Sequence, residues 1–220
     1  MKIAIIIPAF NEEKNIGQVV EEVKKIVPWV IVVDDGSVDG TAQLAKEKNA
    51  EVLKHLVNSG QGAALKTGTE WAVSRGAEII VHFDADGQHL ADDIKVLVEP
   101  IIKNEADVVL GSRFLKKDVK TPLTKKYLIL WPAIIFNWFL TGVKLTDAHN
   151  GLRALNREAW QKISLTQPRM AHNTEILSEI RRNKLYFKEV GVTVLYQDYG
   201  QGLKGGLRII KDLIKGKIFF

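Results

Sequence analysis

The chain is expected to fold as an α/β domain with a mostly parallel sheet flanked by helices, and three observations lead to this expectation. Apolar runs alternate with amphipathic stretches over about the first 110 residues. The runs are continuously apolar, as in parallel strands whose two faces are both covered by helices. Polar clusters follow four of the runs, and ligands bind at the carboxyl ends of strands in such sheets.

Five strands are predicted, at residues 3–7, 30–33, 51–54, 78–83 and 107–110. Pro8 is expected to close the first of them. The apolar start of the chain is too short for a signal peptide, and no small-residue cleavage site follows it. We therefore interpret it as the first buried strand.

Helices are predicted between these strands. Asn11 is a good N-cap for the first helix, and Glu12 and Glu13 would lie in its first turn, where the helix dipole favours acidic side chains. Apolar residues then recur on one helical face as far as Val27. Further helices are expected through residues 44–45, up to residue 71 and over residues 94–102.

The composition is that of an ordinary globular protein, with 46% hydrophobic and 26% charged residues among 220. The absence of cysteine excludes disulfides, thiolate metal sites and a cysteine nucleophile, and it is compatible with a reducing cytoplasm. One domain is expected over residues 1–200, with halves at 1–115 and 116–200. A flexible, basic, amphipathic helical tail is expected at 201–220.

The net charge of +5 is unevenly distributed along the chain. Residues 1–100 hold 10 basic and 16 acidic side chains, a net of −6, whereas residues 101–220 hold 21 and 10, a net of +11. Such a division indicates a surface that faces an anionic partner. Nucleic acid and a phospholipid headgroup layer are the two candidates.

Two carboxylates, Asp84 and Asp86, stand on alternate residues where the fourth strand should end. If both lie about 4 Å from a diphosphate oxygen, each like-charge pair costs roughly 4 kcal/mol at an effective dielectric of ~20. A bridging divalent cation would turn this repulsion into attraction, and two hard oxygen ligands suit Mg²⁺ or Mn²⁺ better than Zn²⁺. The alternative is an acidic turn capping a helix that starts near Ala91, because Asp-x-Asp-Gly also forms good turns.

Polar clusters at residues 8–12, 34–37, 84–88 and 111–113 should meet at one edge of the sheet. Independent turns would have no reason to converge in this way, which favours a binding site. Neither a Gly-x-Gly-x-x-Gly pattern after the first strand nor a Gly-x-x-x-x-Gly-Lys-Ser/Thr loop is present, so dinucleotide and P-loop binding are not indicated. Residues 58–62 contain two glycines, but alone they are only a weak signal of a phosphate-binding loop. They fit a plain turn at least as well.

Five segments match a known family in order and spacing over about the first half of the chain. They are residues 7–12 (Ile-Pro-Ala-Phe-Asn-Glu), 33–41 (Val-Asp-Asp-Gly-Ser-Val-Asp-Gly-Thr), 58–62 (Asn-Ser-Gly-Gln-Gly), 83–89 (Phe-Asp-Ala-Asp-Gly-Gln-His) and 111–114 (Gly-Ser-Arg-Phe). Together they resemble the family 2 glycosyltransferases of the GT-A fold, whose sheet is Rossmann-like. The resemblance is strongest to the branch of dolichyl-phosphate and undecaprenyl-phosphate sugar transferases. It implies a nucleotide-sugar-binding half at 1–115 and an acceptor half at 116–200.

The resemblance also implies roles for the matching residues. A nucleotide sugar would contact Pro8, Ala9, Phe10, Glu12, Asp35, Gly36, Lys66, Asp84, Ala85 and Asp86. Within this set, Asp35 would accept a hydrogen bond from the base. Asp84 and Asp86 would hold Mg²⁺ or Mn²⁺ with the diphosphate, and Gln88 would add an oxygen ligand. Arg113 would grip a phosphate of the donor or of the acceptor, and its alternative is a surface salt bridge.

The second half resembles the family at Asp147, Gly151 and Arg153, which match its Asp…Gly-x-Arg segment beside the acceptor, and at Glu175, an acid at a helix start. With a hydroxyl acceptor, an acid in this region would act as general base. A phosphate acceptor is already ionised, so Asp147 and Glu175 would instead position Arg153 and the substrates. Glu175 is alternatively a plain helix N-terminal acid. The expected catalytic residues are Asp86, Arg113, Asp147, Arg153 and Glu175.

Two segments favour contact with a membrane. Residues 127–143 are strongly apolar but just short of the ~20 residues of a spanning helix, so we predict an interfacial helix with Trp131 and Trp138 in the lipid. A core or dimer helix is the alternative. From residue 204 the tail holds 5 basic residues and 1 acidic residue, including Lys204 and Arg208, which could reach a phosphate. Charge alone gives only ~4 kcal/mol, so apolar insertion must add to it.

These features predict an inverting, metal-dependent glycosyltransferase that moves a hexose from a UDP- or GDP-sugar to a polyprenyl phosphate. It would be peripheral, at the cytoplasmic face of the cell membrane. Two alternatives stay open: transfer to a glycan hydroxyl in polysaccharide synthesis, and a non-catalytic sugar-nucleotide-binding or membrane-docking module. Nucleic-acid binding is disfavoured because the basic runs lack interleaved aromatic platforms. The sugar, the base and any homo-oligomer are undetermined.

Overall fold

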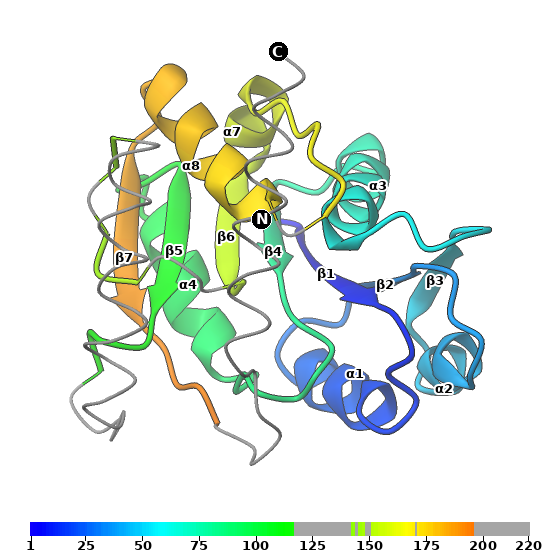
Figure 1. Ribbon diagram of the computed structural model, residues 1–220. Coiled ribbons are helices and arrows are strands. Elements are labelled where there is room, and N and C mark those ends of the chain that lie inside the picture. The colour runs from blue at the N-terminus through cyan, green and yellow to red at the C-terminus, as the bar shows by residue number, and fades with distance from the viewer. Residues whose placement is uncertain (117–141, 144, 148–150, 170, 196–220) are drawn as a thin grey trace, which may run out of the picture.

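The computed structural model of the chain describes residues 1–116, 142–143, 145–147, 151–169 and 171–195 (Figure 1). Most of the apolar segment at 127–143 and all of the tail at 201–220 lie outside these residues, so their predicted roles stay predictions. Of the helices formed by the described residues, none is long and apolar enough to cross a membrane.

The described residues form one seven-stranded sheet, in the order β3-β2-β1-β4-β6-β5-β7. Every neighbouring pair is parallel except the two pairs that involve β6, which is antiparallel. The expected mostly parallel sheet is therefore confirmed, and each of the five predicted strands is present within two residues at either end. The strands are β1 (Ile3–Ala9), β2 (Val30–Asp34), β3 (Glu51–Lys54), β4 (Ile79–His82), β5 (Val108–Ser112), β6 (Arg153–Asn156) and β7 (Phe187–Gly191).

Helices cover both faces of the sheet (Figure 1). One face carries α1 (Ile16–Lys24), α2 (Thr41–Glu47) and α4 (Asp93–Ile102), and the other carries α3 (Gln61–Ser74), α7 (Arg157–Lys162) and α8 (His172–Arg182). The central strand β1 shows why two layers are needed. Ile5 and Ile7 are buried in the first apolar layer, and Ala4 and Ile6 in the second. A strand that is apolar at every position must be covered on both sides.

Pro8 lies inside β1 instead of closing it. The N–H of Ile5 points toward β2 and donates a hydrogen bond to the carbonyl oxygen of Trp29, just before that strand, at 3.0 Å. Because successive residues of a strand face opposite neighbours, the position of the missing Pro8 N–H faces β4. The pairing of β4 with β1 ends at His82, opposite Ile6, so no hydrogen bond is lost.

Asn11 does not cap the first helix, contrary to the sequence-based expectation. It has a φ of 56°, and its side-chain oxygen accepts a hydrogen bond from the N–H of Val38 at 3.1 Å. α1 begins only at Ile16, after a turn in which the Glu12 carbonyl oxygen accepts hydrogen bonds from the N–H groups of Asn15 and Ile16. Asparagine tolerates the left-handed conformation well, so the same residue type suits this loop as well as a helix cap.

The start of α3 packs tightly against residues 167–169. The N–H of Ala63 donates to the Pro168 carbonyl oxygen at 3.1 Å. A Cβ on Gly62 would overlap the carbonyl oxygen of Gln167. A Cβ on Gly60, which has a φ of 99°, would likewise overlap the carbonyl oxygen of Pro168. The two glycines therefore allow the β3–α3 loop to lie against a segment far later in the chain.

The substitution Gly62→Ala tests this packing. The added methyl group must displace backbone, so we expect the free energy of unfolding to fall by about 1–3 kcal/mol. Gly17→Ala in α1 is the matched control, because the nearest atom to its Cβ is 3.9 Å away and alanine is the better helix former. Urea unfolding measures both variants. Equal stability of the two would contradict the packing described here.

Candidate active site

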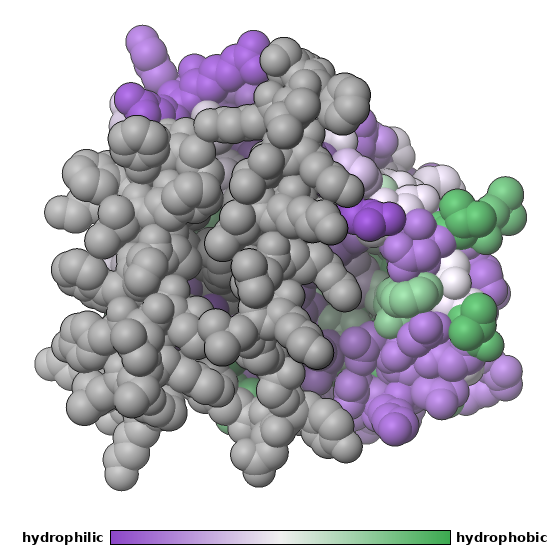
Figure 2. All heavy atoms as spheres, viewed as in Figure 1, coloured by the Kyte–Doolittle hydropathy of each residue, from purple (hydrophilic) through white to green (hydrophobic). Residues whose placement is uncertain are grey.

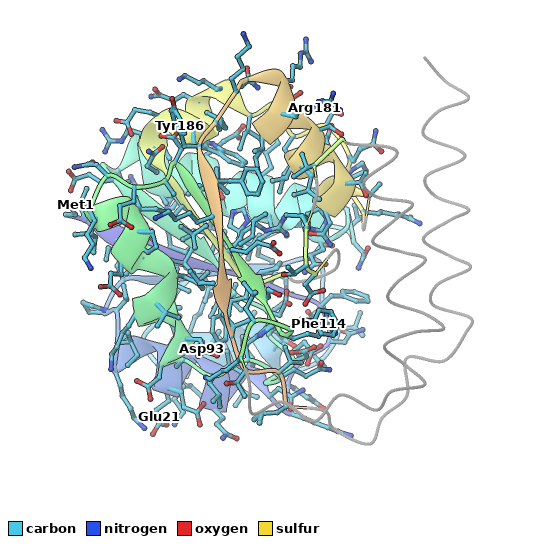
Figure 3. The ribbon with its side chains drawn as sticks, turned by 90° about the vertical axis from the view of Figure 1, so that its left-hand side faces the viewer. Met1, Glu21, Asp93, Phe114, Arg181 and Tyr186 are labelled. Atoms are coloured by element: carbon cyan, nitrogen blue, oxygen red, sulfur yellow. The ribbon has the colours of Figure 1, made fainter. Side chains whose placement is uncertain are left out.

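The polar clusters that follow β1, β2, β4 and β5 lie at the carboxyl edge of the parallel strands, where open α/β sheets bind ligands. Asp35 directly follows β2, and Arg113 directly follows β5. Figure 3 shows Phe114 at the same end of β5, and Asp93 near the carboxyl end of β7. The predicted convergence of polar clusters on one edge is therefore observed.

Asp84 is held from two sides. Gln61, at the start of α3, donates from Nε2 to Oδ1 of Asp84 at 2.9 Å, and Nε2 of His89 lies 3.3 Å from Oδ2. Burial by itself raises the pKa of Asp84, but the hydrogen bond and charge of His89, followed by the charge of Arg153, bring it below its ordinary value. This carboxylate is therefore kept ionised and fixed in orientation.

Asp86 and Glu12 show the opposite shift. Burial raises the pKa of Asp86, and the charge of Asp84 adds to the rise against the hydrogen bond from the Gln88 N–H. Burial also raises the pKa of Glu12, and the charges of Asp86, Asp39 and Asp84 add to it. Negative charge is therefore concentrated between the ends of β1 and β4.

A divalent cation fits this cluster. Carboxylate oxygens are the ligands that Mg²⁺ and Mn²⁺ prefer, and a cation would relieve the repulsion that adds to the effect of burial on the two pKa values. Within the described part of the chain, no three His, Cys, Asp or Glu side chains converge to hold a metal ion. Mg²⁺ is usually held by one or two carboxylates together with substrate phosphates. The backbone N–H of Gln88 donates a hydrogen bond to Oδ1 of Asp86, and its carbonyl oxygen accepts one from the N–H of Leu195.

Arg153 is buried at the start of β6 among uncharged partners. Its Nη2 donates to Oδ1 of Asn173 at 2.5 Å and lies 3.2 Å from Nε2 of His172. Nδ1 of His172 lies 2.8 Å from the carbonyl oxygen of Arg169, which can only accept, so Nδ1 carries the proton and Nε2 offers a lone pair to Arg153. The charge of Arg153 is therefore left to act on Asp84.

Burial sets the protonation states of this pair. It lowers the pKa of Arg153 to about 10, against the opposing charge of Asp84. Burial, followed by the charge of Arg153, lowers the pKa of His172 to about 4. At neutral pH the network therefore combines a guanidinium cation with a neutral imidazole.

Asp147 is tied to Arg113. Its Oδ2 accepts hydrogen bonds from Nε of Arg113 at 2.6 Å and from the Arg113 backbone N–H at 3.2 Å, and its side chain is 1% exposed. Glu189 on β7 accepts hydrogen bonds from the neighbouring N–H of Thr146, so this segment is held on both sides. A guanidinium bound through Nε has a fixed plane, and Asp147 therefore positions Arg113.

Glu175 in α8 accepts hydrogen bonds from the N–H and hydroxyl of Thr166 and from the N–H of Gln167. It thereby holds the segment that packs on the start of α3. These contacts support the structural alternative for Glu175, and its catalytic role stays a prediction.

The predicted nucleotide contacts after β1 and β2 lie together. The N–H of Asp35 donates to the Ala9 carbonyl oxygen at 2.8 Å, and Phe10 is 45% exposed beside it in sequence. Gly36 has a φ of 78°, and a Cβ there would come 2.7 Å from the carbonyl carbon of Val57. Glycine is therefore required where the β2 and β3 loops meet.

Lys66 is not brought to this edge. It is exposed on α3, 4.0 Å from Glu70, and lines a surface hollow with residues 160–165. Leu65 and Thr69 occupy the buried face of the helix, which turns Lys66 outward. The structure therefore does not support a nucleotide contact for Lys66. Ala85, another predicted nucleotide contact, is buried in the apolar layer. The predicted acceptor and membrane residues Trp131, Trp138, Lys204 and Arg208 lie outside the described residues.

Three partners of the site have no role assigned by the sequence pattern: Gln61, His89 and Asn173. Gln61 and His89 at least stand inside matching segments, one in the glycine-rich stretch and one at the end of the acidic motif. Asn173 gives no such sign. Their contacts with Asp84 and Arg153 join distant parts of the chain, and no local pattern reports such contacts.

Known proteins match most of this chain. The model of the family described as glycosyl transferase family 2 matches residues 4–164. A UDP-N-acetylglucosamine–dolichyl-phosphate N-acetylglucosaminyltransferase of Methanococcus voltae is 36% identical over 98% of this chain and 96% of that protein. A polyprenol monophosphomannose synthase of Mycolicibacterium smegmatis is 34% identical over 74% of this chain and 64% of that protein.

Solved structures show the same fold. A glucosyl-3-phosphoglycerate synthase of Mycobacterium tuberculosis, solved in complex with Mn²⁺, UDP and glucosyl-3-phosphoglycerate, matches with a TM-score of 0.70. It is 20% identical in sequence, and the match covers 97% of this chain and 79% of that one. At this identity the likeness is one of fold, and it confirms the expected GT-A architecture.

His172 gives stability a dependence on pH. Its pKa is about 4 in the folded chain against an ordinary 6.5, so below pH 6.5 the unfolded chain binds a proton that the folded chain excludes. The stability that its neutral form supports is fully present above pH 6.5. We expect it to fall by about 3 kcal/mol as the pH drops toward 4, as measured by urea unfolding at a series of pH values.

The variant His172→Gln separates this effect from other acid-sensitive groups. Its amide oxygen can still accept a hydrogen bond from Arg153, but it does not titrate. Between pH 6.5 and 4, its free energy of unfolding should therefore fall by about 3 kcal/mol less than that of the unaltered chain, which is the effect of one bound proton. Parallel stability curves for the two proteins would contradict the neutral, buried state of His172.

Proposed function

The chain belongs to glycosyl transferase family 2, and from this premise we propose that it transfers a hexose from a nucleotide diphosphate sugar to a polyprenyl phosphate. The transfer uses Mg²⁺ or Mn²⁺ and takes place at the cytoplasmic face of the membrane, with the enzyme bound peripherally. Relatives that are named for transfer to dolichyl phosphate and undecaprenyl phosphate support this choice of acceptor.

The observation that carries the acceptor assignment is the pairing of Asp147 with Arg113. A hydroxyl acceptor must lose a proton as it attacks, so it needs a base with a lone pair within reach. Asp147 is the acid expected in that role, and its Oδ2 accepts hydrogen bonds from Nε and from the backbone N–H of Arg113. A phosphate acceptor is already ionised and needs a cation instead of a base. Arg113 supplies that cation.

On the donor side, Asp84 and Asp86 would hold the divalent ion together with the diphosphate, and Gln88 would be a further ligand. When bound, the ion would supply positive charge beside the leaving diphosphate. Asp84 is prepared for this role by Gln61 and His89, which fix its orientation before the substrate arrives. Such preorganisation removes the cost of turning dipoles during the reaction.

The reaction is a single displacement with inversion. A phosphate oxygen of the acceptor attacks the anomeric carbon in line, and the new C–O bond forms as the bond to the diphosphate breaks. The bonding electrons leave with the nucleoside diphosphate, and no proton has to move. Arg113 and Arg153 place positive charge near the phosphates, while Trp131, Trp138, Lys204 and Arg208 would hold the lipid side.

A transfer assay tests the proposal. Each of a panel of UDP- and GDP-hexoses is incubated with the enzyme, Mn²⁺ or Mg²⁺, and either polyprenyl phosphate or the matching polyprenol. We expect a glycolipid product from the phosphate and none from the alcohol, because Asp147, the acid expected as a base, is bound to Arg113. Product from polyprenol, and none from polyprenyl phosphate, would contradict the acceptor assignment.

Asp147→Asn separates positioning from base catalysis. If Asp147 aligns Arg113, kcat/KM for the acceptor should fall by about 10- to 100-fold with the pH profile unchanged. The matched control is Asp107→Asn at the other end of β5, where Asp107 also accepts two hydrogen bonds but lies away from the site. Loss of one limb of the pH profile in Asp147→Asn would instead identify a general base.

Asp86→Asn tests the cation. It removes a charge from the pair, so Mn²⁺ should no longer raise the melting temperature in the presence of nucleotide, and transfer should fall at least about 100-fold. Chelation of the metal should have the same two effects on the unaltered enzyme. Asp92→Asn, which alters an exposed acid paired with Lys95, is the control that should keep both responses. A metal response that survives in Asp86→Asn would refute the assignment.

A further inference from the structure

The carboxylate of Asp35 is almost fully used by hydrogen bonds within the chain. Its Oδ1 accepts from the N–H of Ser59 at 2.9 Å and lies 2.7 Å from Nδ1 of His55, and its Oδ2 accepts from the N–H of Gly60 at 2.6 Å. The side chain is 4% exposed. Three donors from one loop therefore surround the carboxylate that follows β2.

Of these three donors, His55 alone acts through its side chain. A carboxylate only accepts hydrogen bonds, so Nδ1 of His55 carries the proton. Nε2 of the same ring lies 3.0 Å from Oγ1 of Thr67 on α3, which holds the ring in its plane. The backbone of His55 is held as well, because its N–H donates to the Asp34 carbonyl oxygen at 2.9 Å.

A count of lone pairs shows what is left for a ligand. A carboxylate offers about four acceptor sites, two on each oxygen. His55 and Ser59 take both sites on Oδ1, and Gly60 takes one on Oδ2. One site on Oδ2 remains, and the small exposed fraction of the side chain suits a single incoming donor.

Exposed apolar side chains lie around this acceptor, on the loops that follow β1, β2 and β3. Phe10 is 45% exposed, Val38 92%, Leu56 100% and Val57 69%. Figure 2 shows hydrophobic atoms gathered over these loops, in the right-hand part of the molecule. Apolar surface beside one buried acceptor suits a flat nucleobase, whose faces stack and whose edge forms hydrogen bonds.

Building on the proposed use of a nucleotide sugar, we propose that His55 is a positioning residue that sets base selectivity through Asp35. It favours a base that presents one N–H, such as uracil, over guanine. Uracil offers its single imide N–H to one acceptor. Guanine offers a ring N–H and an amino N–H side by side, which a carboxylate matches with one free site on each oxygen. His55 occupies the site on Oδ1, so one guanine donor is left unpaired and binding is weakened.

Calorimetric titration of the full chain with UDP, GDP and IDP in the presence of Mn²⁺ tests this selectivity. We expect UDP to bind at least about tenfold more tightly than GDP, the effect of one unpaired donor. IDP has the purine ring of GDP without the amino group, so it differs from GDP by the second donor and not by ring size. It should bind several-fold more tightly than GDP.

Two variants of His55 sharpen the test. His55→Ala frees the second site on Oδ1, so the preference for UDP over GDP should shrink to less than about threefold, and GDP should now bind more tightly than IDP. His55→Asn is the matched control, because its side-chain amide N–H can take the place of Nδ1–H. It should keep the order of affinities for the three nucleotides that is found with the unaltered chain. A general loss of stability would weaken the binding of all three nucleotides without changing that order.

The outcomes separate this inference from the proposed function. Equal binding of UDP and GDP by the unaltered chain, or an unchanged ligand order in His55→Ala, would overturn the role of His55 and leave the proposed transfer intact. Binding of none of the three diphosphates by the unaltered chain would overturn the proposed donor and this inference together.

Discussion

Negative charge at the carboxyl end of β4 is the constraint on which the rest of the site depends. Asp84 is stabilised by His89 and by the buried Arg153, whereas Asp86 and Glu12 have raised pKa values beside it. A buried guanidinium costs several kcal/mol in lost hydration unless its hydrogen-bond donors are satisfied. Asn173 and His172 contact Nη2, and the Gly151 carbonyl oxygen accepts a hydrogen bond from Nε, so Arg153 gains partners without added negative charge and remains available to Asp84. One edge thus combines a carboxylate that is already stabilised with two that gain from a cation.

The neutral state of His172 links this charge balance to the packing of the fold. The His172 ring is held between the Arg169 carbonyl oxygen and Arg153. A Cβ on Gly62 would lie 3.0 Å from the Cβ of His172. The same start of α3 supplies Gln61 to Asp84. The close contact between the β3–α3 loop and residues 167–169 therefore aligns groups on both sides of the site, and a change in that packing is expected to disturb both.

Three acidic side chains in the described part of the second half hold neighbouring segments in place. Asp147 binds Arg113, Glu175 binds the Thr166–Gln167 segment, and Glu189 binds the segment around Thr146. These acids are thereby committed to structure, and the half that carries the excess of basic residues presents Arg113 at the edge of the sheet. This division suits an anionic acceptor, since a phosphate needs charge and orientation from the protein and no proton acceptor.

Local sequence was enough to predict the parallel sheet, the positions of its first five strands, the edge at which the polar clusters lie, and the acidic pair Asp84 and Asp86. These features follow from local apolar periodicity and from the residue types at strand ends. Both depend on residues that are close together in the sequence. The tertiary structure decided that Asn11 links two loops, that Lys66 faces away from the site, and which side chains hold Asp84, Arg153 and Asp35. Those outcomes depend on contacts between segments far apart in the chain, and the residue pattern of one segment does not record which atoms of another will meet it.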